Sequence, residues 1–453
     1  MERASANQAA TAIPFLSRDL ERYRKRSSPA GANDQWTWVI IGLVLLGIVY
    51  SGLLALVNAH GFAIGRNTVV LAEISILGAG GLVILATGPR KVDGAPSAFL
   101  AFFIFDALVV SLIGNDFFVD MARNAAIIAV FMMLGARVDS RHLHRCVTIA
   151  AVVVLLVLLL EMVSVSTYAT LFAPADYFAN TRGIAKRNFD QMGLFANALG
   201  FDSRFAIATI MSHRACSIFL EQVSLANFAI VLTMVLACDW RRLPLGTAAF
   251  YAGLIALIIV TTNSRLALGL TLLTPVAILL ASRLNRNLTL LIMPLTIIIA
   301  GVVAINAPST YSDDLQGRLA KTALALNNMD LGAMSGLSTS SAAGFADSGY
   351  AYVIYASSVL GLVGLWLFVA LVAAEKDKPR LLRCSLMLNL YVFCSLTVSG
   401  NSVFSMKTAA LLWLLIGNVR SDPGETEAAE ETPIPTAARH PTLRLLSPKS
   451  ARG

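Results

Sequence analysis

The fold of this chain is decided by apolar runs such as residues 146–163, CVTIAAVVVLLVLLLEMV, in which Glu161 is the single charged residue. As a helix, a run of this length spans about 27 Å, close to the roughly 30 Å of hydrocarbon in a bilayer. Similar runs recur throughout the 453 residues, which are 57% hydrophobic and 14% charged, against roughly 45–50% and 25% in soluble domains. Because the runs are continuous rather than alternating, they exclude a β-barrel. We predict an all-α, polytopic helical membrane protein.

Hydropathy divides the chain into a membrane domain, residues 36–419, and two polar tails, residues 1–35 and 420–453. The tails lack apolar periodicity and are expected to be disordered. The domain contains about twelve candidate spans, two of which are joined by the short turn Thr262 to Arg265. The spans are expected at about 36–57, 69–88, 97–113, 121–136, 146–172, 218–238, 245–261, 266–281, 288–304, 350–374, 381–398 and 403–419.

The distribution of Lys and Arg sets the predicted orientation, because these residues are enriched in cytoplasmic loops. With the N-terminus inside, 24 of the 35 basic residues fall on the inner side and 11 on the outer side. An even number of spans then places both tails in the cytoplasm. The net charge of +8 therefore marks membrane orientation and is no sign of nucleic-acid binding.

Two outer segments, residues 173–217 and 305–349, are long enough to suggest function. The first interleaves basic residues with phenylalanines, and the second is rich in Ser, Ala and Gly at Ser335–Gly344, which suggests mobility. Positive charge on the outer side favours an anionic substrate, since guanidinium groups suit phosphate. The alternative is that these side chains simply face water. The basic residues are Arg182, Lys186, Arg187, Arg204 and Arg214.

Arg214 and Arg265 differ from the other outer arginines because both lie at helix mouths. Arg214 belongs to SHRACSIFLEQ, residues 212–222, and Arg265 belongs to TTNSRLALG, residues 261–269, in the tight hairpin. An Arg in so short a turn stays near the membrane surface, so the two guanidiniums could clamp a pyrophosphate. The alternative is that both extend toward lipid head groups.

Three motifs together carry a family resemblance. They are Arg-x-x-Ser-x-Phe-x-Glu at 214–221, Thr-x-Ser-Arg at 262–265, and Asp-Ser-Gly-Tyr-Ala-Tyr at 347–352 followed by Gly-Leu-Val-Gly-Leu at 361–365. In their order and topological placement they resemble the Wzy-type polysaccharide polymerases and O-antigen ligases, most of all the exopolysaccharide polymerases of the xanthan or sphingan type. The resemblance covers about residues 180 to 420.

This resemblance implies a metal-independent, cofactor-free glycosyltransferase with a GT-C-like fold. Its substrate would be undecaprenyl-pyrophosphate-linked oligosaccharide, polymerised at the periplasmic face of the bacterial inner membrane. Arg214 and Arg265 would hold the donor pyrophosphate. Its surroundings would be the lipid bilayer, with a chain-length regulator and a flippase of the same pathway as further partners. The remaining candidates for substrate binding are His213, Ser217, Ser264, Tyr350, Arg182 and Arg187.

A general base for the attacking hydroxyl is expected among the outer carboxylates. The ligases carry a His before the helix that follows the second long loop, whereas residues 305–349 contain Asp347 and no His. This difference counts against ligation, which stays the alternative activity. Asp347 and Glu221 are the candidates to accept the proton. Glu221 could instead orient Arg214, and we favour that role for it.

The rival from another class is a lipid-linked-sugar flippase or other secondary transporter. Ionisable residues within apolar runs are functional by default, and a transporter would use Glu73, Asp106 and Glu161 as ion or proton carriers. Glu161 is the deepest of the three. The five cysteines and the histidines offer no spacing for a disulfide framework or a zinc site.

Overall fold

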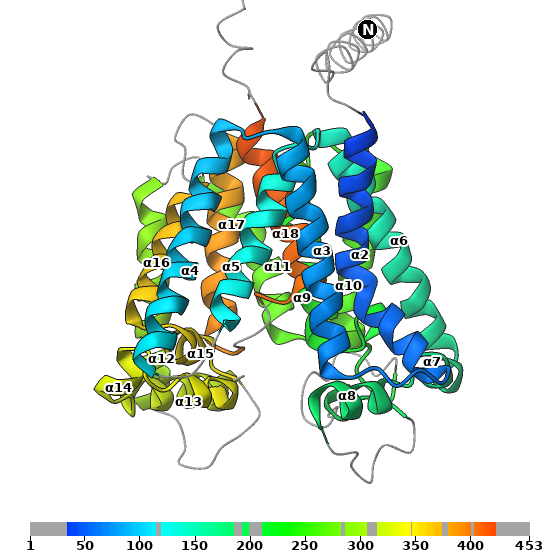
Figure 1. The fold of residues 1–453 in the computed structure, drawn as a ribbon. Helices are drawn as coiled ribbons and strands as arrows, with labels where there is room; N and C mark the ends of the chain where they lie inside the picture. Colours follow the sequence, from blue (N-terminus) through cyan, green and yellow to red (C-terminus); the bar gives the residue numbers. More distant parts are fainter. Residues whose placement is uncertain are drawn as a thin grey trace, which may run out of the picture. The chain divides into compact units, whose positions relative to one another are not determined.

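The computed structural model describes residues 34–114, 119–184, 193–198, 211–281, 286–305, 315–345, 347–373, 379–399 and 403–422. Throughout these ranges the chain is helical and contains no strand, as the sequence predicts (Figure 1). The contacts divide the chain after Asp422, and Pro423–Gly453 lies outside the described residues, as do residues 1–33. The predicted disorder of both tails therefore stays a prediction.

Seventeen described α-helices follow one another along the chain. They are α2 (Asp34–Ala59), α3 (Arg66–Thr87), α4 (Gly94–Gly114), α5 (Asp120–Gly135), α6 (Ser140–Val163), α7 (Val165–Phe172), α8 (Pro174–Arg182), α9 (Gln222–Asp239), α10 (Leu245–Thr262), α11 (Arg265–Ala281), α12 (Thr289–Ile305), α13 (Leu315–Asn327), α14 (Leu331–Met334), α15 (Gly349–Ala356), α16 (Val359–Leu371), α17 (Pro379–Leu396) and α18 (Met406–Ser421).

Six of the helical segments are long and apolar enough to cross a membrane. They are Gln35–Ala59, Arg66–Thr87, Lys91–Gly114, Ser140–Val163, Gln222–Asp239 and Leu245–Thr262. A seventh is added if α15 and α16 are taken as one bent span, whereas α11 and α12 are apolar but shorter. By length and composition, the described residues contain six or seven candidate spans, and the count of about twelve stays a prediction.

Two predicted spans are not continuous helices. The span expected at 146–172 breaks at Ser164, whose hydroxyl accepts a hydrogen bond from the backbone N–H of Thr167 (3.3 Å) and so begins α7. The span expected at 350–374 bends by 119° between α15 and α16, where the hydroxyl of Ser358 accepts from the N–H of Gly361 (3.2 Å). A serine that caps a new helix interrupts the preceding one, and hydropathy does not detect this.

The two long segments, residues 173–217 and 305–349, both contain helices and lie at the same end of the bundle. The first contributes α8, which follows α7 directly, and the second contributes α13 and α14, all at the lower end in Figure 1. Part of the Ser- and Gly-rich stretch forms the short 3-10 helix Thr339–Phe345, and its mobility stays a prediction. The opposite end carries buried ion pairs, including Arg137 with Asp93 (2.8 Å) and Arg380 with Asp239.

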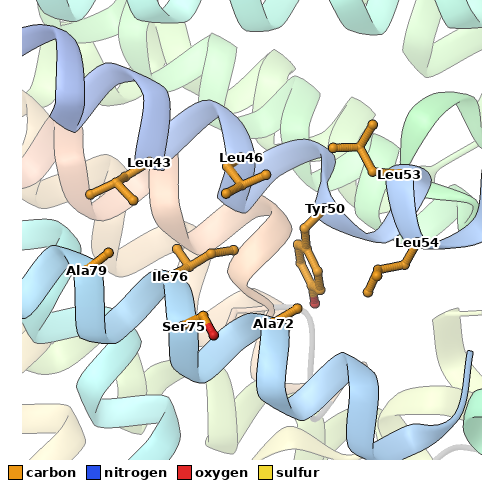
Figure 2. A pocket seen from close by; sticks show the side chains of 9 residues that line it. All are labelled: Leu43, Leu46, Tyr50, Leu53, Leu54, Ala72, Ser75, Ile76 and Ala79. Atoms are coloured by element: carbon orange, nitrogen blue, oxygen red, sulfur yellow. The ribbon is translucent and has the colours of Figure 1, made fainter. Parts of the chain in front are cut away.

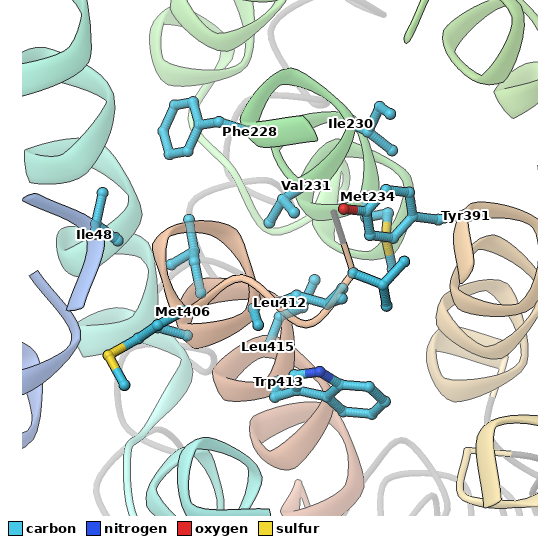
Figure 3. Close-up of a cluster of buried hydrophobic side chains, with 14 of the residues drawn as sticks. Ile48, Phe228, Ile230, Val231, Met234, Tyr391, Met406, Leu412, Trp413 and Leu415 are labelled. Atoms are coloured by element: carbon cyan, nitrogen blue, oxygen red, sulfur yellow. The ribbon is translucent and has the colours of Figure 1, made fainter. Parts of the chain in front are cut away.

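The core is built around α18, which is buried along most of its length and packs on α5 and α9. Figure 3 shows side chains of α9 and α18, with Trp413 among the largest fully buried residues. Gly135 of α5 and Gly417 of α18 let the two backbones approach closely. A Cβ at Gly417 would lie 1.9 Å from the carbonyl oxygen of Met132, and one at Gly135 would lie 2.1 Å from that of Leu414. Small residues allow this approach between membrane helices.

Replacing Gly417 tests this contact. Gly417→Ala should destabilise the fold by roughly 1–3 kcal/mol, because the new methyl group meets backbone that has no side chain to rotate away. The control is Gly253→Ala on α10, where a Cβ meets nothing within 4 Å and helix propensity should leave stability equal or slightly higher. The measurement is thermal unfolding of both purified variants in detergent. Equal melting temperatures would refute the close contact.

Candidate functional site

Glu161 of α6 holds the segment that carries Arg214. The fully buried carboxylate of Glu161 accepts hydrogen bonds from the backbone N–H of Cys216 (3.0 Å) and of Ser217 (2.7 Å). Nε2 of His213 lies 3.2 Å from the same carboxylate. A buried charge needs such partners, because desolvation is otherwise costly. Glu161 therefore holds the backbone that follows Arg214 and the side chain of the residue that precedes it.

Ser217 contributes to this local structure. Its φ of 49° lies in the left-handed region, and its hydroxyl donates to the carbonyl of Val154 (2.8 Å). Its own carbonyl accepts from the hydroxyl of Tyr168 (2.7 Å), and the residue is fully buried. These contacts account for the motif serine within the fold, and its role in substrate binding stays a prediction.

Arg214 is held against the hairpin that ends in Arg265. Its Nε donates to the carbonyl of Thr262 (2.8 Å), and the N–H of Ala215 donates to the carbonyl of Thr261 (3.0 Å). The two motifs are thus in direct contact, although Arg214 and Thr262 are 48 positions apart in the sequence. Arg214 is 6% exposed, whereas Arg265 is partly exposed as the first residue of α11.

The hairpin itself is shaped by Asn263 and Ser264. Asn263 takes a left-handed conformation (φ 52°) that ends α10, a geometry that Asn tolerates better than most residues. The hydroxyl of Ser264 accepts from the N–H of Ala267 (3.3 Å), which is the usual position of a helix N-cap. Ser264 therefore starts α11 at Arg265. Its predicted contact with substrate is not needed to explain its place in the motif.

Two buried polar atoms, in the residues next to Arg214 and next to its partner Thr262, have no hydrogen-bond partner among the described residues. They are Nδ1 of His213 and Oδ1 of Asn263. Both belong to the motifs that the sequence singled out, and His213 keeps this nitrogen unused while its other ring nitrogen faces Glu161. A buried polar atom without a partner is unusual and calls for a functional or structural reason.

Glu221 lies between two cations, Arg182 of α8 and Lys407 of α18. It forms an ion pair with Arg182, and its other oxygen lies 3.2 Å from Nζ of Lys407. Burial acts to raise the pKa of Glu221, but the two cations outweigh this effect and lower the pKa to about 2. The orientation of Arg214 by Glu221 stays a prediction, whereas a carboxylate with so low a pKa is a weak general base.

A second charged group adjoins this one on α2, α3 and α5. Glu73 accepts hydrogen bonds from the hydroxyl of Tyr50 (2.5 Å) and from Nε of Arg123 (2.8 Å). Beside Arg123, the amide of Asn124 donates to the hydroxyl of Tyr352 on α15 (3.2 Å). Arg123 explains why the predicted fourth span begins with polar residues. Its charge is matched by Glu73, which the transporter reading had assigned to ion transport.

Asp347 lies at the end of the second long segment and is partly exposed, whereas Tyr350, just after this segment, is buried. Asp347 is about half exposed and forms an ion pair with Lys321 of α13 (2.8 Å). Tyr350 is fully buried, where its hydroxyl contacts Thr296 (2.8 Å) and donates to the carbonyl of Phe393 (3.0 Å). Tyr350 is therefore packed in the core, and its role as a substrate ligand stays a prediction. Arg187, together with Lys186 and Arg204, lies outside the described residues.

Lys407 and Arg123 are the site residues that sequence reasoning missed. Lys407 is buried at the start of α18, where its Nζ also donates to the carbonyl of Phe219 (3.0 Å) inside the arginine motif. An ionisable residue beside a long apolar run was the available signal. Within the described residues, no group of three His, Cys, Asp or Glu is placed to hold a metal ion.

Comparison of the chain with protein-family models, characterised proteins and solved structures finds no match. The function is therefore inferred from the residues and geometry of the site.

The role of Glu161 can be tested by an isosteric change. Glu161→Gln should lower stability by about 1.5–3 kcal/mol, because the amide cannot replace a charged acceptor of several N–H groups. Asp106→Asn is the matched control, since the described residues offer Asp106 one hydrogen bond, from the hydroxyl of Ser358 at 3.2 Å. Asp106→Asn should lower stability less than Glu161→Gln does. Thermal unfolding in detergent measures both.

The same variant separates an enzyme from a transporter. If Glu161 anchors the loop, any loss of activity should follow the loss of folded protein. A stable Glu161→Gln protein that makes no product, while lipid-linked substrate accumulates on the inner leaflet, would instead assign Glu161 to transport.

Proposed function

We propose that this chain is a polysaccharide polymerase that joins lipid-pyrophosphate-linked oligosaccharide repeat units at the outer face of a bacterial inner membrane. The observation that carries the proposal is the direct contact between the two arginine motifs, through Arg214 and Thr262 and through Ala215 and Thr261. Each of the two motifs carries an Arg, and the motifs adjoin one another. Two arginines can bind one doubly charged leaving group only if their loops are adjacent. The resemblance to Wzy-type polymerases supports the same reading.

The chemistry needs few groups. The bond between the sugar C1 and the pyrophosphate oxygen breaks while an acceptor hydroxyl attacks C1, so negative charge grows on the leaving oxygen. Guanidiniums that are already in place stabilise this charge more than mobile water does. Arg214 meets this condition because a backbone carbonyl and the Glu161-anchored segment hold it. Nδ1 of His213, which has no hydrogen-bond partner among the described residues, would be a further group of this segment available to the pyrophosphate.

The proton of the attacking hydroxyl needs an acceptor. Of the two candidates, we favour Asp347, because the ion pairs and low pKa of Glu221 suit it to holding Arg182 and Lys407 in place. Asp347 is half exposed and belongs to the other long segment. The proposal therefore includes a movement that brings the two long segments together when substrate is bound.

The proposed topology is the one that the sequence suggests, with about twelve spans, a GT-C-like arrangement and both termini in the cytoplasm. The helices α5, α11, α12, α17 and α18, together with the bent pair α15 and α16, would complete the spans that length and composition do not assign. The transporter alternative is weakened by the contacts of Glu161, whose oxygens face backbone N–H groups and His213. Ligation would require a base that is not the ligase-type His.

Reconstitution tests the proposed activity. Purified protein in liposomes with undecaprenyl-pyrophosphate repeat units should produce a ladder of longer glycans on a gel, without ATP or added metal. Arg214→Ala and Arg265→Ala should each slow chain growth at least ~10-fold, because each charged contact contributes about 1.5–3 kcal/mol. Lys at either position should restore activity only in part, since it lacks the bidentate fork.

Asp347→Asn provides the contrast. It should lower turnover while the Km for the donor changes little, because a general base acts mainly on the chemical step. Arg66→Ala, at the exposed first residue of α3, is the control for an outer arginine outside the motifs and should leave the ladder unchanged. Near-normal ladders from both motif variants at matched expression would remove the pyrophosphate clamp.

A further inference from the structure

A hollow of about 350 Å³ lies between α2 and α3, at the side of the bundle (Figure 2). Its α2 wall is formed by leucines and Tyr50, and its α3 wall by Ala72, Ser75, Ile76 and Ala79. Leu46 and Leu53 on its rim are 39% and 46% exposed, so the hollow opens to the surroundings of the bundle. Its size is within the range of small-molecule sites.

The sequence of α3 explains the hollow. Ala72, Ser75 and Ala79 recur at intervals of three and four residues and so share one face of the helix. These side chains are too short to fill the space opposite the leucines of α2. The lining is almost wholly apolar, which suits a hydrocarbon chain and excludes a sugar. From Leu43 to Leu54 the hollow follows α2 for about 16 Å at 1.5 Å per residue.

Cationic groups adjoin the hollow at Tyr50. The hydroxyl of Tyr50 donates to Glu73, which is also the partner of Arg123. Arg182 lies on α8, which packs against both α2 and α3, and its guanidinium pairs with Glu221. An apolar channel that ends beside these groups is complementary to a lipid with an anionic head.

The wall helix α2 also touches the arginine motif. Gly52, two residues after Tyr50, packs closely on Ile218. A Cβ added at Gly52 would lie 2.7 Å from the carbonyl oxygen of Ile218. Ile218 follows Ser217, whose N–H is bound by Glu161. The hollow and the Arg214 segment are therefore joined by one backbone contact.

We propose that the hollow between α2 and α3 holds the polyprenyl chain of the lipid-pyrophosphate substrate, with the pyrophosphate directed toward Arg214. This inference rests on the proposed function and adds to it the site of the lipid. Continuity with the arginine segment and the neighbouring cations favour this occupant over the acyl chain of a bulk phospholipid.

Binding of undecaprenyl diphosphate and of inorganic pyrophosphate to the purified full-length protein tests the inference. Ala79→Leu fills the hollow and should weaken undecaprenyl diphosphate binding about tenfold, while pyrophosphate binding stays unchanged. Ala86→Leu is the control, because Ala86 is exposed on the same helix and does not line the hollow. Unchanged affinity in Ala79→Leu would overturn the inference and leave the proposed function intact.

A second measurement covers the case in which Ala79→Leu does not fold. Ser75→Cys should react with N-ethylmaleimide, and bound undecaprenyl diphosphate should slow that reaction about tenfold, while Ala86→Cys stays equally reactive. Phosphatidylglycerol at the same concentration should not protect Ser75→Cys. Equal protection by phosphatidylglycerol would make the hollow a general lipid groove and overturn the inference. If the wild-type protein binds neither pyrophosphate nor undecaprenyl diphosphate, the proposed function itself fails.

Discussion

The buried carboxylate of Glu161 is the interaction on which the candidate site depends. A charge inside an apolar bundle is stable only when its hydrogen bonds are satisfied, and here the partners are the N–H groups of Cys216 and Ser217 and the ring of His213. Satisfying Glu161 therefore forces residues 213–217 into one conformation, in which Ser217 adopts a positive φ. Arg214 is part of this segment, so its position beside Thr262 of the hairpin is fixed as well.

The rest of the site is tied to the core by charges at helix ends. Lys407 lies in the first turn of α18, the helix that packs closely on α5 through Gly417, and it contacts both Phe219 and Glu221 of the arginine motif. Glu221 in turn holds Arg182 on α8. Elements distant in sequence are thereby fixed to one another by buried or half-buried ion pairs. Such pairs contribute little to net stability but give a unique geometry to the groups they join, which is the property a pre-formed anion site requires.

Hydropathy predicted the helical class and the approximate position of most helices, because the length of an apolar run is a local property. It did not predict the breaks at Ser164 and Ser358, which depend on single side chains that cap a new helix. Residue type and spacing singled out the two arginine motifs, which the structure brings into contact through Arg214 and Thr262. The same reasoning could not foresee that the hydroxyls of Ser217 and Tyr350 make hydrogen bonds inside the protein, since only the packing shows this. Lys407 was missed because its partner Glu221 lies 186 positions away.

The central claim is that Arg214 and Arg265 act on one pyrophosphate. The most direct measurement is the coupling free energy between them, from the rates of chain growth of the wild-type protein, Arg214→Ala, Arg265→Ala and the double variant in liposomes. If both serve one leaving group, the double variant should be less impaired than the product of the single effects, with a coupling of at least about 1 kcal/mol. Effects that add to within about 0.5 kcal/mol would contradict the claim and show two independent sites.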